Sequence, residues 1–167
     1  MVTTNLREPV SAWVALGANL GNPAQALMQA LAGLSQLPDT CVVAASALYE
    51  SAPLQAEGPM YVNAVAAVST ALNAYQLLQA LQSMEQQAGR QRIAPNAPRT
   101  LDLDLLFYGT SRIDGPWLTV PHPRWQERAF VLRPLQDVAP ERVSAQMLAR
   151  VADQQIYRSV SVIWDSK

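Results

Sequence analysis

Residues 101–108 read Leu-Asp-Leu-Asp-Leu-Leu-Phe-Tyr, an apolar run in which two aspartates alternate with leucines. Alternation with a period of two predicts a β-strand, and Gly109 ends the run. On a strand, Asp102 and Asp104 point to the same face and lie about 7 Å apart along the backbone. The stretch therefore predicts a strand with one apolar face and one face that carries two carboxylates.

The segments before this strand alternate between the apolar spacing of a strand and that of a helix. In chain order, the pattern predicts a strand at 11–16, a turn at 17–22, a helix at 23–36, a strand at 40–49, a loop at 50–60, a strand at 61–70, a helix at 73–89, a loop at 90–98 and the strand at 101–108. This order of elements is that of a ferredoxin-like arrangement, in which an antiparallel sheet carries helices on one face. We therefore expect an α+β fold, formed by residues 1–167 as a single domain.

The chain after this strand has weaker periodicity. Short helical turns are expected near 125–128 and 131–138. The tail at 144–167 is expected to hold a short helix and a strand around 156–163.

Composition excludes several classes of protein. The chain has 167 residues, a formal net charge of −1 and a pI near 5.8, whereas proteins that bind the nucleic-acid backbone are usually basic. One cysteine, Cys41, rules out a disulfide framework, and its apolar surroundings in the sequence predict a core position. One histidine, His122, rules out the two-histidine metalloprotease motif. No apolar run is long enough to cross a membrane and the first residues lack a signal-peptide pattern, so we expect a cytoplasmic protein.

The basic residues are nearly all arginine and gather in the middle of the chain. Residues 90–133 hold seven arginines against four acidic residues, a net charge of +3. Arginine presents a planar fork of donors that matches phosphate and carboxylate groups. The cluster indicates either a polyanion held by arginines with a divalent metal beside the aspartates, or the solvated surface of a protein from an arginine-preferring genome. Composition alone does not choose between these interpretations.

The two aspartates and the arginines just before them are candidates for one nucleotide site. Mg²⁺ takes one or two carboxylates together with phosphate oxygens and water, although an ordinary half-exposed strand gives the same alternation. Arg90, Arg92 and Arg99 are placed in the sequence to clamp a triphosphate against such a metal. The chain has no Walker motif and no Gly-x-Gly-x-x-Gly fingerprint, so a nucleotide has to be held here by arginines and metal.

Side chains elsewhere are candidates for binding the rest of a ligand. His122, between two prolines, is able to donate to a phosphate oxygen, although a lone histidine is more often structural. Tyr61 and Phe130 are able to stack on a flat heterocycle, although aromatic side chains often simply fill the core. Asn63 shares the strand face of Tyr61, where its amide is able to bond the edge of a heterocycle.

Seven segments of the chain carry a resemblance to a known family. They are ALGANLGNP (15–23), YESAPL (49–54), YVNAV (61–65), MEQQAGRQR (84–92), APRTLDLDLLFYG (97–109), LTVPHPR (118–124) and ERAFVLRPLQDVAP (127–140). In these segments, which span about residues 13–141, the chain resembles the 6-hydroxymethyl-7,8-dihydropterin pyrophosphokinases of folate biosynthesis. The PRTLDLD string followed by VPHPR is the most specific part of the likeness.

This resemblance implies transfer of pyrophosphate from ATP to the hydroxymethyl group of the pterin, with release of AMP. It also implies a ferredoxin-like core elaborated into a three-layer αβα domain, and a monomeric enzyme without nucleic-acid or membrane partners. Two Mg²⁺ ions are expected on Asp102 and Asp104. The resemblance assigns ATP binding to Glu85, Arg90, Arg92, Arg99, Leu118, Thr119, His122 and Arg128, and catalysis to Arg90, Arg99 and Asp104. It assigns pterin binding to Ser51, Ala52, Leu54, Tyr61, Asn63, Asp102 and Phe130.

The sequence departs from the usual pattern of the family most clearly at two positions, with milder changes at Ser51, where threonine is common, and at Ala52, where proline is common. Asn96 stands where a tryptophan is common, in a segment one residue shorter, and Trp117 stands where a basic residue is common. Neither departure removes an expected metal ligand, so we expect the chemistry to be retained.

Two other classes of protein remain open at this point. A ferredoxin-like RNA-binding module would use Tyr61 and Phe130 for stacking, but the pI and the lack of an aromatic-rich RNP-type strand count against it. A metal-dependent nucleotidyl transferase or phosphodiesterase would also suit an Asp-x-Asp strand with arginines. Formation of AMP that depends on the pterin separates the pyrophosphokinase from both.

Overall fold

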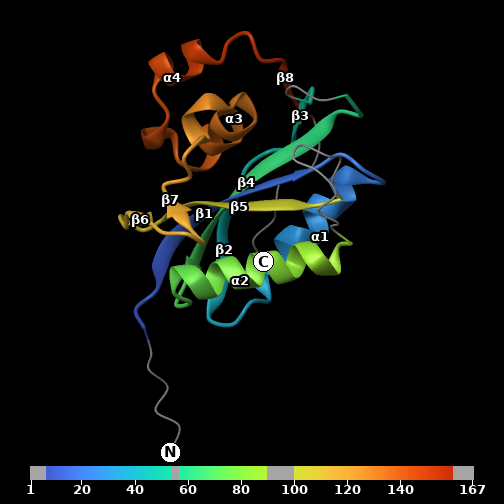
Figure 1. Cartoon of the computed structure of the whole chain (residues 1–167). Coiled ribbons are helices and arrows are strands. Elements are labelled where there is room, and N and C mark those ends of the chain that lie inside the picture. The colour runs from blue at the N-terminus through green and yellow to red at the C-terminus, as the bar shows by residue number, and fades with distance from the viewer. Residues whose placement is uncertain (1–6, 54–56, 90–99, 160–167) are drawn as a thin grey trace, which may run out of the picture.

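In the computed structural model, the chain folds into an antiparallel sheet with helices on both faces (Figure 1). The structure describes residues 7–53, 57–89 and 100–159. The strands of the main sheet are Val10–Ala18 (β1), Thr40–Ala45 (β2), Tyr49–Ser51 (β3), Tyr61–Thr70 (β4), Asp102–Tyr108 (β5) and Ile156–Arg158 (β8). A separate hairpin consists of Ile113–Asp114 (β6) and Thr119–Val120 (β7). The helices are Pro23–Ser35 (α1), Ala74–Gln87 (α2), Ala129–Val138 (α3) and Ala145–Arg150 (α4), with 3₁₀ turns at Trp125–Glu127 (η1) and Pro140–Arg142 (η2).

The sheet has the strand order β5-β1-β4-β3-β8, and β2 pairs with β4 beyond the end of β3. Strand β4 is therefore shared: β3 pairs with its start at Tyr61–Asn63, and β2 pairs with its second half. The prediction of one strand over 40–49 was wrong, because the strand breaks at residues 46–48. There Ser46 bonds Val65 twice, once through its backbone N–H and once by accepting the Val65 N–H at its hydroxyl, both at 2.9 Å.

Helices α1 and α2 cover one face of the sheet, as the sequence pattern predicted (Figure 1). Each begins at an asparagine in its own segment. The side chain of Asn22 accepts from the Gln25 N–H at 3.2 Å, and Asn73 forms a capping box with Gln76. Their apolar residues join those of the strands in the larger core of the protein; those from the helices are Leu27, Ala30, Leu31, Leu34, Ala74, Leu77 and Leu81.

Helices α3 and α4 cover the opposite face, which gives three layers (Figure 1). A second buried cluster lies there, in which Leu132 and Leu135 of α3 contact the sheet at Val65 and at Leu106–Phe107. Because the two clusters lie on opposite faces, alternating side chains of the central strands are buried on both sides of the sheet. This arrangement confirms the expected α+β class, an antiparallel sheet with helices.

Other details differ from the sequence prediction. Gly17 and Ala18 continue β1 instead of starting a turn, because both are paired with β4. Cys41 is exposed, not in the core, because Val42 takes the inward position of β2. The hairpin of β6 and β7 was not predicted. Helix α4 and β8 match the short helix and strand expected in the tail, of which residues 160–167 lie outside the described residues. Within the described ranges, every helix is too short or too polar to cross a membrane.

Candidate active site

The two aspartates occupy the start of β5 and face the layer of α3. Asp102 and Asp104 are half-buried and alternate with the buried Leu103 and Leu105. Both leucines belong to the core beneath α1 and α2, so the carboxylates point to the opposite face of the sheet. The predicted pair of carboxylates on one strand face is therefore present.

A row of paired residues crosses the sheet from Asp102. Gly17 pairs with Asp102 on one side and with Asn63 on the other, and Asn63 pairs with Tyr49. Paired residues on neighbouring strands share a face, so Asp102, Asn63 and Tyr49 point the same way. A Cβ on Gly17 would lie 3.3 Å from Oδ1 of Asn63, which is tighter than most such contacts. Glycine therefore leaves open space between a carboxylate and an amide, which a larger side chain would fill.

A histidine and an arginine lie within electrostatic range of the two aspartates. Burial, followed by the charge of Arg128, lowers the pKa of His122, and the charge of Asp102 opposes that change. Burial also lowers the pKa of Arg128, which senses Arg124 first and then Asp104 and Asp102. Because the charge of Asp102 acts on His122, and the charges of both aspartates act on Arg128, the structure brings these four side chains into one site.

The histidine is held by backbone contacts in a defined tautomer. The His122 N–H donates to the carbonyl of Leu106 on β5 at 2.9 Å, which attaches residues 121–123 to the strand of the aspartates. Nδ1 of His122 accepts from the Arg124 N–H at 3.1 Å. In the neutral ring the proton then lies on Nε2, which is left as a hydrogen-bond donor.

Glu85 of α2 supports the same strand from the opposite face. It is buried, and its Oε1 accepts from the Leu103 N–H at 2.7 Å, between the two aspartates in the chain. A charge-assisted bond of this kind is among the stronger hydrogen bonds in proteins. The residue expected to contact the nucleotide thus also fixes the backbone that carries the two aspartates.

The pterin candidates form a second group beside this site. The Asn63 amide donates to Oγ of Ser51 at 2.8 Å, and Tyr61 pairs with Ser51 across β3 and β4. Phe130 lies in the first turn of α3, with the Arg128 guanidinium 5.4 Å from its ring centre. Side chains of this group therefore offer an amide, a hydroxyl and two aromatic rings.

A cleft of about 240 Å³ opens between β3 and the start of α3. We call it the Phe130 cleft, and it is lined by Ser51, Ala52, Pro53, Ala129, Phe130, Asp153, Gln154 and Gln155. Three of the pterin candidates line it, whereas Tyr61 and Asn63 lie outside the lining. Residues 153–155 were not predicted as part of a site, and the sequence carries no motif that could have pointed to them.

The adenosine candidates lie on the hairpin. Leu118 is buried and Thr119 pairs with Asp114, while the neighbouring Trp117 has 81% of its surface exposed. Of these two neighbours, Leu118 therefore points into the protein and Trp117 faces solvent. The remaining sequence candidates, Leu54, Arg90, Arg92, Asn96 and Arg99, lie outside the described residues.

The donor set fits magnesium. Within residues 7–53, 57–89 and 100–159, no group of three or more His, Cys, Asp and Glu side chains forms a ready-made metal site. Two half-buried carboxylates on one face suit an ion that takes its other ligands from phosphate and water. An acidic pair opposite an arginine and a neutral histidine is typical of enzymes that transfer phosphoryl-type groups from a metal–nucleotide complex.

Comparison with known proteins identifies the family. The model of the family described as 7,8-dihydro-6-hydroxymethylpterin-pyrophosphokinase (HPPK) matches residues 13–140. The chain is 49% identical to the 2-amino-4-hydroxy-6-hydroxymethyldihydropteridine pyrophosphokinase of Pseudomonas aeruginosa over 130 residues, 77% of this chain and 80% of that one. It is 36% identical to the Bacillus subtilis enzyme of the same name over 157 residues, 93% of this chain and 91% of that one. The chain belongs to the HPPK family.

Solved structures agree on the fold. The wild-type HPPK-DHPS of Plasmodium falciparum with pterin and p-hydroxybenzoate matches with a TM-score of 0.66 at 14% identity, over 90% of this chain. The chain spans 45% of that longer protein, so the likeness concerns the fold of one part of it. Enzymes of the HPPK family use ATP and Mg²⁺ to transfer pyrophosphate to hydroxymethyldihydropterin in folate synthesis, and this chain is accordingly an ATP-dependent pyrophosphokinase. Membership of the HPPK family selects the pyrophosphokinase over the RNA-binding module and the nucleotidyl transferase or phosphodiesterase that the sequence left open.

Proposed function

We propose that the face of the sheet beneath α3 carries the whole reaction, with the nucleotide at β5 and the pterin at β3 and β4. The row from Asp102 through Gly17 to Asn63 is the observation that carries this assignment. It sets a carboxylate for metal–phosphate beside an amide for a heterocycle, with open space between them. A donor and an acceptor that must react are best held side by side in this way.

Asp102 and Asp104 would hold two Mg²⁺ ions together with the phosphate oxygens of ATP. When bound, the ions neutralise charge on the phosphates and on the departing AMP. His122 supports the phosphates through its Nε2–H, which is a donor in the neutral ring. Arg128 adds a permanent positive charge on the same side. We assign further ATP contacts to Glu85, Arg90, Arg92, Arg99, Leu118 and Thr119.

The pterin ring would stack between Tyr61 and Phe130. Its polar edge meets the Asn63 amide, which the hydroxyl of Ser51 already orients, and the backbone of Ala52 and Leu54. Asp102 borders the ring from β5. An aromatic pair and an amide recognise a flat molecule with a hydrogen-bonding edge, which is the chemistry of a pterin.

The hydroxyl of the pterin attacks the β-phosphorus of ATP in line, the bond to the α-phosphate oxygen breaks, and AMP leaves. Asp104 accepts the proton of the hydroxyl, while Arg90 and Arg99 stabilise the charge on the transferred group. Positioning and electrostatic stabilisation supply most of the rate acceleration in a transfer of this type.

We also propose that residues 1–167 work as a single pyrophosphokinase domain, as a monomer in the cytoplasm and without nucleic-acid or membrane partners. The net charge of −1 is in keeping with small-molecule substrates.

The test is an assay with ATP, Mg²⁺ and 6-hydroxymethyl-7,8-dihydropterin, followed by chromatography of the nucleotides. We expect AMP to form only when the pterin is present. Formation of ADP would contradict transfer of pyrophosphate. In the same assay Asn63→Leu, which keeps the volume and removes the amide, should raise the KM for the pterin far more than the KM for ATP. An equal effect on both KM values would contradict the assignment of Asn63.

A further inference from the structure

The segment at residues 153–158 lies beyond the matched part of the family model, which ends at residue 140, and it contacts both walls of the Phe130 cleft. Its strand β8 pairs with β3, with Ile156 opposite Ser51 and Arg158 opposite Tyr49. The next residue continues the attachment, because the Ser159 N–H donates to the carbonyl of Leu48 at 2.8 Å. Strand β3, which forms one wall of the cleft, is thereby paired along its free edge by this segment.

Gln154 attaches the same segment to the other wall. Its Oε1 accepts from the Ala129 N–H and its Nε2 donates to the carbonyl of Glu127, both at 2.8 Å. Arg128, the N-cap residue of α3, makes no capping bond with its own side chain. Gln154 therefore satisfies one of the free N–H groups at the start of α3 from 25 residues away in the chain. The two bonds flank Arg128, and the second of the bonded residues, Ala129, directly precedes Phe130.

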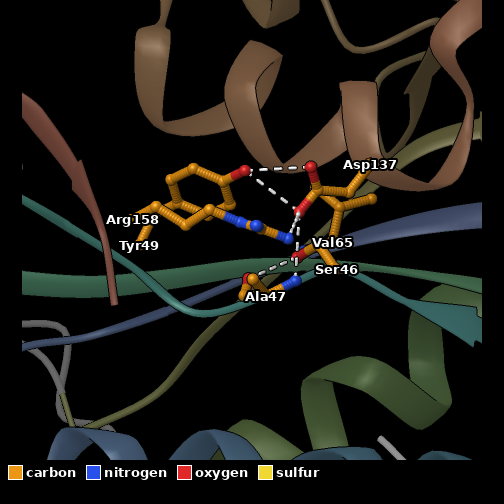
Figure 2. Close-up of polar contacts among 6 residues, drawn as sticks. All are labelled: Ser46, Ala47, Tyr49, Val65, Asp137 and Arg158. Carbon is orange, nitrogen blue, oxygen red and sulfur yellow. Dashed lines mark hydrogen bonds and ion pairs between the residues drawn. The ribbon is translucent and has the colours of Figure 1, made fainter. Parts of the chain in front are cut away.

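A third contact joins the two walls through Asp137 near the end of α3. Its carboxylate accepts from the hydroxyl of Tyr49 at 2.9 and 3.0 Å and from the Ala47 N–H at 3.1 Å (Figure 2). Arg158 of β8 forms an ion pair with the same carboxylate at 3.7 Å (Figure 2). Burial, with the hydrogen bond to Asp137 second, raises the pKa of Tyr49, so the phenol stays a donor at neutral pH. The Asp137 side chain thus connects α3 with Ala47, with Tyr49 of β3 and with Arg158 of β8.

We propose that residues 153–158 are a brace that holds β3 and the start of α3 at the separation that a pterin ring requires. This proposal rests on the proposed function, in which the pterin binds against Phe130 at the α3 wall of the cleft. Gln154 and Asp137 are positioning residues: they act through Phe130 on one wall and through Ser51 on the other. Without Gln154, the backbone at the start of α3 loses its hydrogen bonds to a side chain of a distant segment, and Phe130 is held at its distance from β3 only by apolar packing and by the contacts of Asp137 near the end of α3.

The test measures binding of the pterin and of MgATP separately, each by fluorescence titration of the full chain. Gln154→Ala removes both bonds and should raise the Kd of the pterin about tenfold, because two hydrogen bonds are lost. The Kd of MgATP should change less, through Arg128 alone. Asp137→Ala should raise the Kd of the pterin and leave that of MgATP unchanged, because its partners belong to β3 and its flank. Asp137→Asn keeps an acceptor for Tyr49 and should restore part of the affinity.

Two further variants keep the result interpretable. Gln146→Ala changes an exposed glutamine of α4 and should leave both Kd values at the wild-type level. Gln154→Glu keeps the acceptor for the Ala129 N–H and loses the donor to Glu127, so it should lie between the wild type and Gln154→Ala. It also serves if Gln154→Ala does not fold.

The outcomes separate this proposal from the assignment of the cleft. If Phe130→Ala weakens binding of the pterin but Gln154→Ala and Asp137→Ala do not, the brace is refuted and the cleft stands. If Phe130→Ala has no effect on the pterin, the proposed function of the cleft fails as well. Equal loss of affinity for both ligands would mean that the segment only stabilises the fold, which also overturns the brace.

Discussion

Helices α2 and α3 lie on opposite faces of one sheet and begin in different ways. Asn73 and Gln76 cap α2 from within its own first turn, so a stretch of four residues suffices to start it. Helix α3 has no such cap and takes Gln154 from a distant segment. The face covered by the locally capped helices α1 and α2, which we call the frame, holds the larger core of the protein. The face covered by α3, which depends on distant contacts, carries the proposed reaction. The difference shows where local sequence determines structure and where tertiary contacts do.

The most severe change should come from the aspartates on the reactive face. Asp102→Ala or Asp104→Ala should lower kcat/KM by on the order of 10³-fold or more, because a lost metal ligand removes several kcal/mol of transition-state stabilisation. Formation of AMP in steady-state assays measures the loss. Asp114→Ala, at an exposed aspartate of the hairpin, is the control and should keep full activity. Near-wild-type turnover of either site variant would remove the distinction between the two faces.

Core substitutions should separate stability from binding. Leu81→Ala on the buried face of α2 and Leu132→Ala on the buried face of α3 both truncate fully buried leucines and should each cost about 2–5 kcal/mol of unfolding free energy. Urea denaturation measures both losses. Only Leu132→Ala should also raise the KM for the pterin, because it loosens the helix whose first turn carries Phe130. A similar rise in KM for Leu81→Ala would show that the frame is not independent of the site.

The caps offer a smaller contrast. Asn73→Ala removes the capping box of α2 and should lower the free energy of unfolding by about 1 kcal/mol. Affinity for the pterin should not change, in contrast to the effect expected for Gln154→Ala. Paired denaturation and fluorescence titrations test this. If loss of the Asn73 cap weakened the pterin as much as loss of Gln154, the distinction between local and distant caps would have no functional meaning.

The smallest expected effect is a shift in the titration of His122, the only histidine of the chain. Its pKa lies below 6.5 in the folded protein, because of burial and then Arg128. As pH falls through 6.5 towards that lowered value, the unfolded chain binds a proton before the folded protein does, and stability decreases. Proton NMR of the imidazole follows the titration. Arg128→Leu should raise the pKa, and a titration at or above 6.5 in the wild type would contradict the placement of His122.

Much of the frame could be predicted because its information is local. The alternation of Asp102 and Asp104 with leucines determines both the strand and the face of the carboxylates. Asn22 and Asn73 mark the starts of two helices by side-chain chemistry within a few residues. The same residues allowed the order of elements, and with it the α+β class, to be predicted before any three-dimensional information.

The rest depends on contacts between residues far apart in the chain. The strand over 40–49 breaks at Ser46 because of Val65 and Asp137, neither of which is near it in sequence. Cys41 was wrongly placed in the core because an apolar run does not reveal which of its residues face inward. Residues 153–155 were not predicted to line the cleft, because it is the pairing of β8 with β3, far apart in the chain, that brings them to it.

The position of β8 in the chain has a consequence for synthesis. Every other strand of the sheet leaves the ribosome before β8, and chains fold from the N-terminus as they emerge. A nascent chain can therefore assemble its central sheet and both Asn-capped helices while β3 still has an open edge. The Phe130 cleft is therefore complete only after β8 has followed the other described strands out of the ribosome.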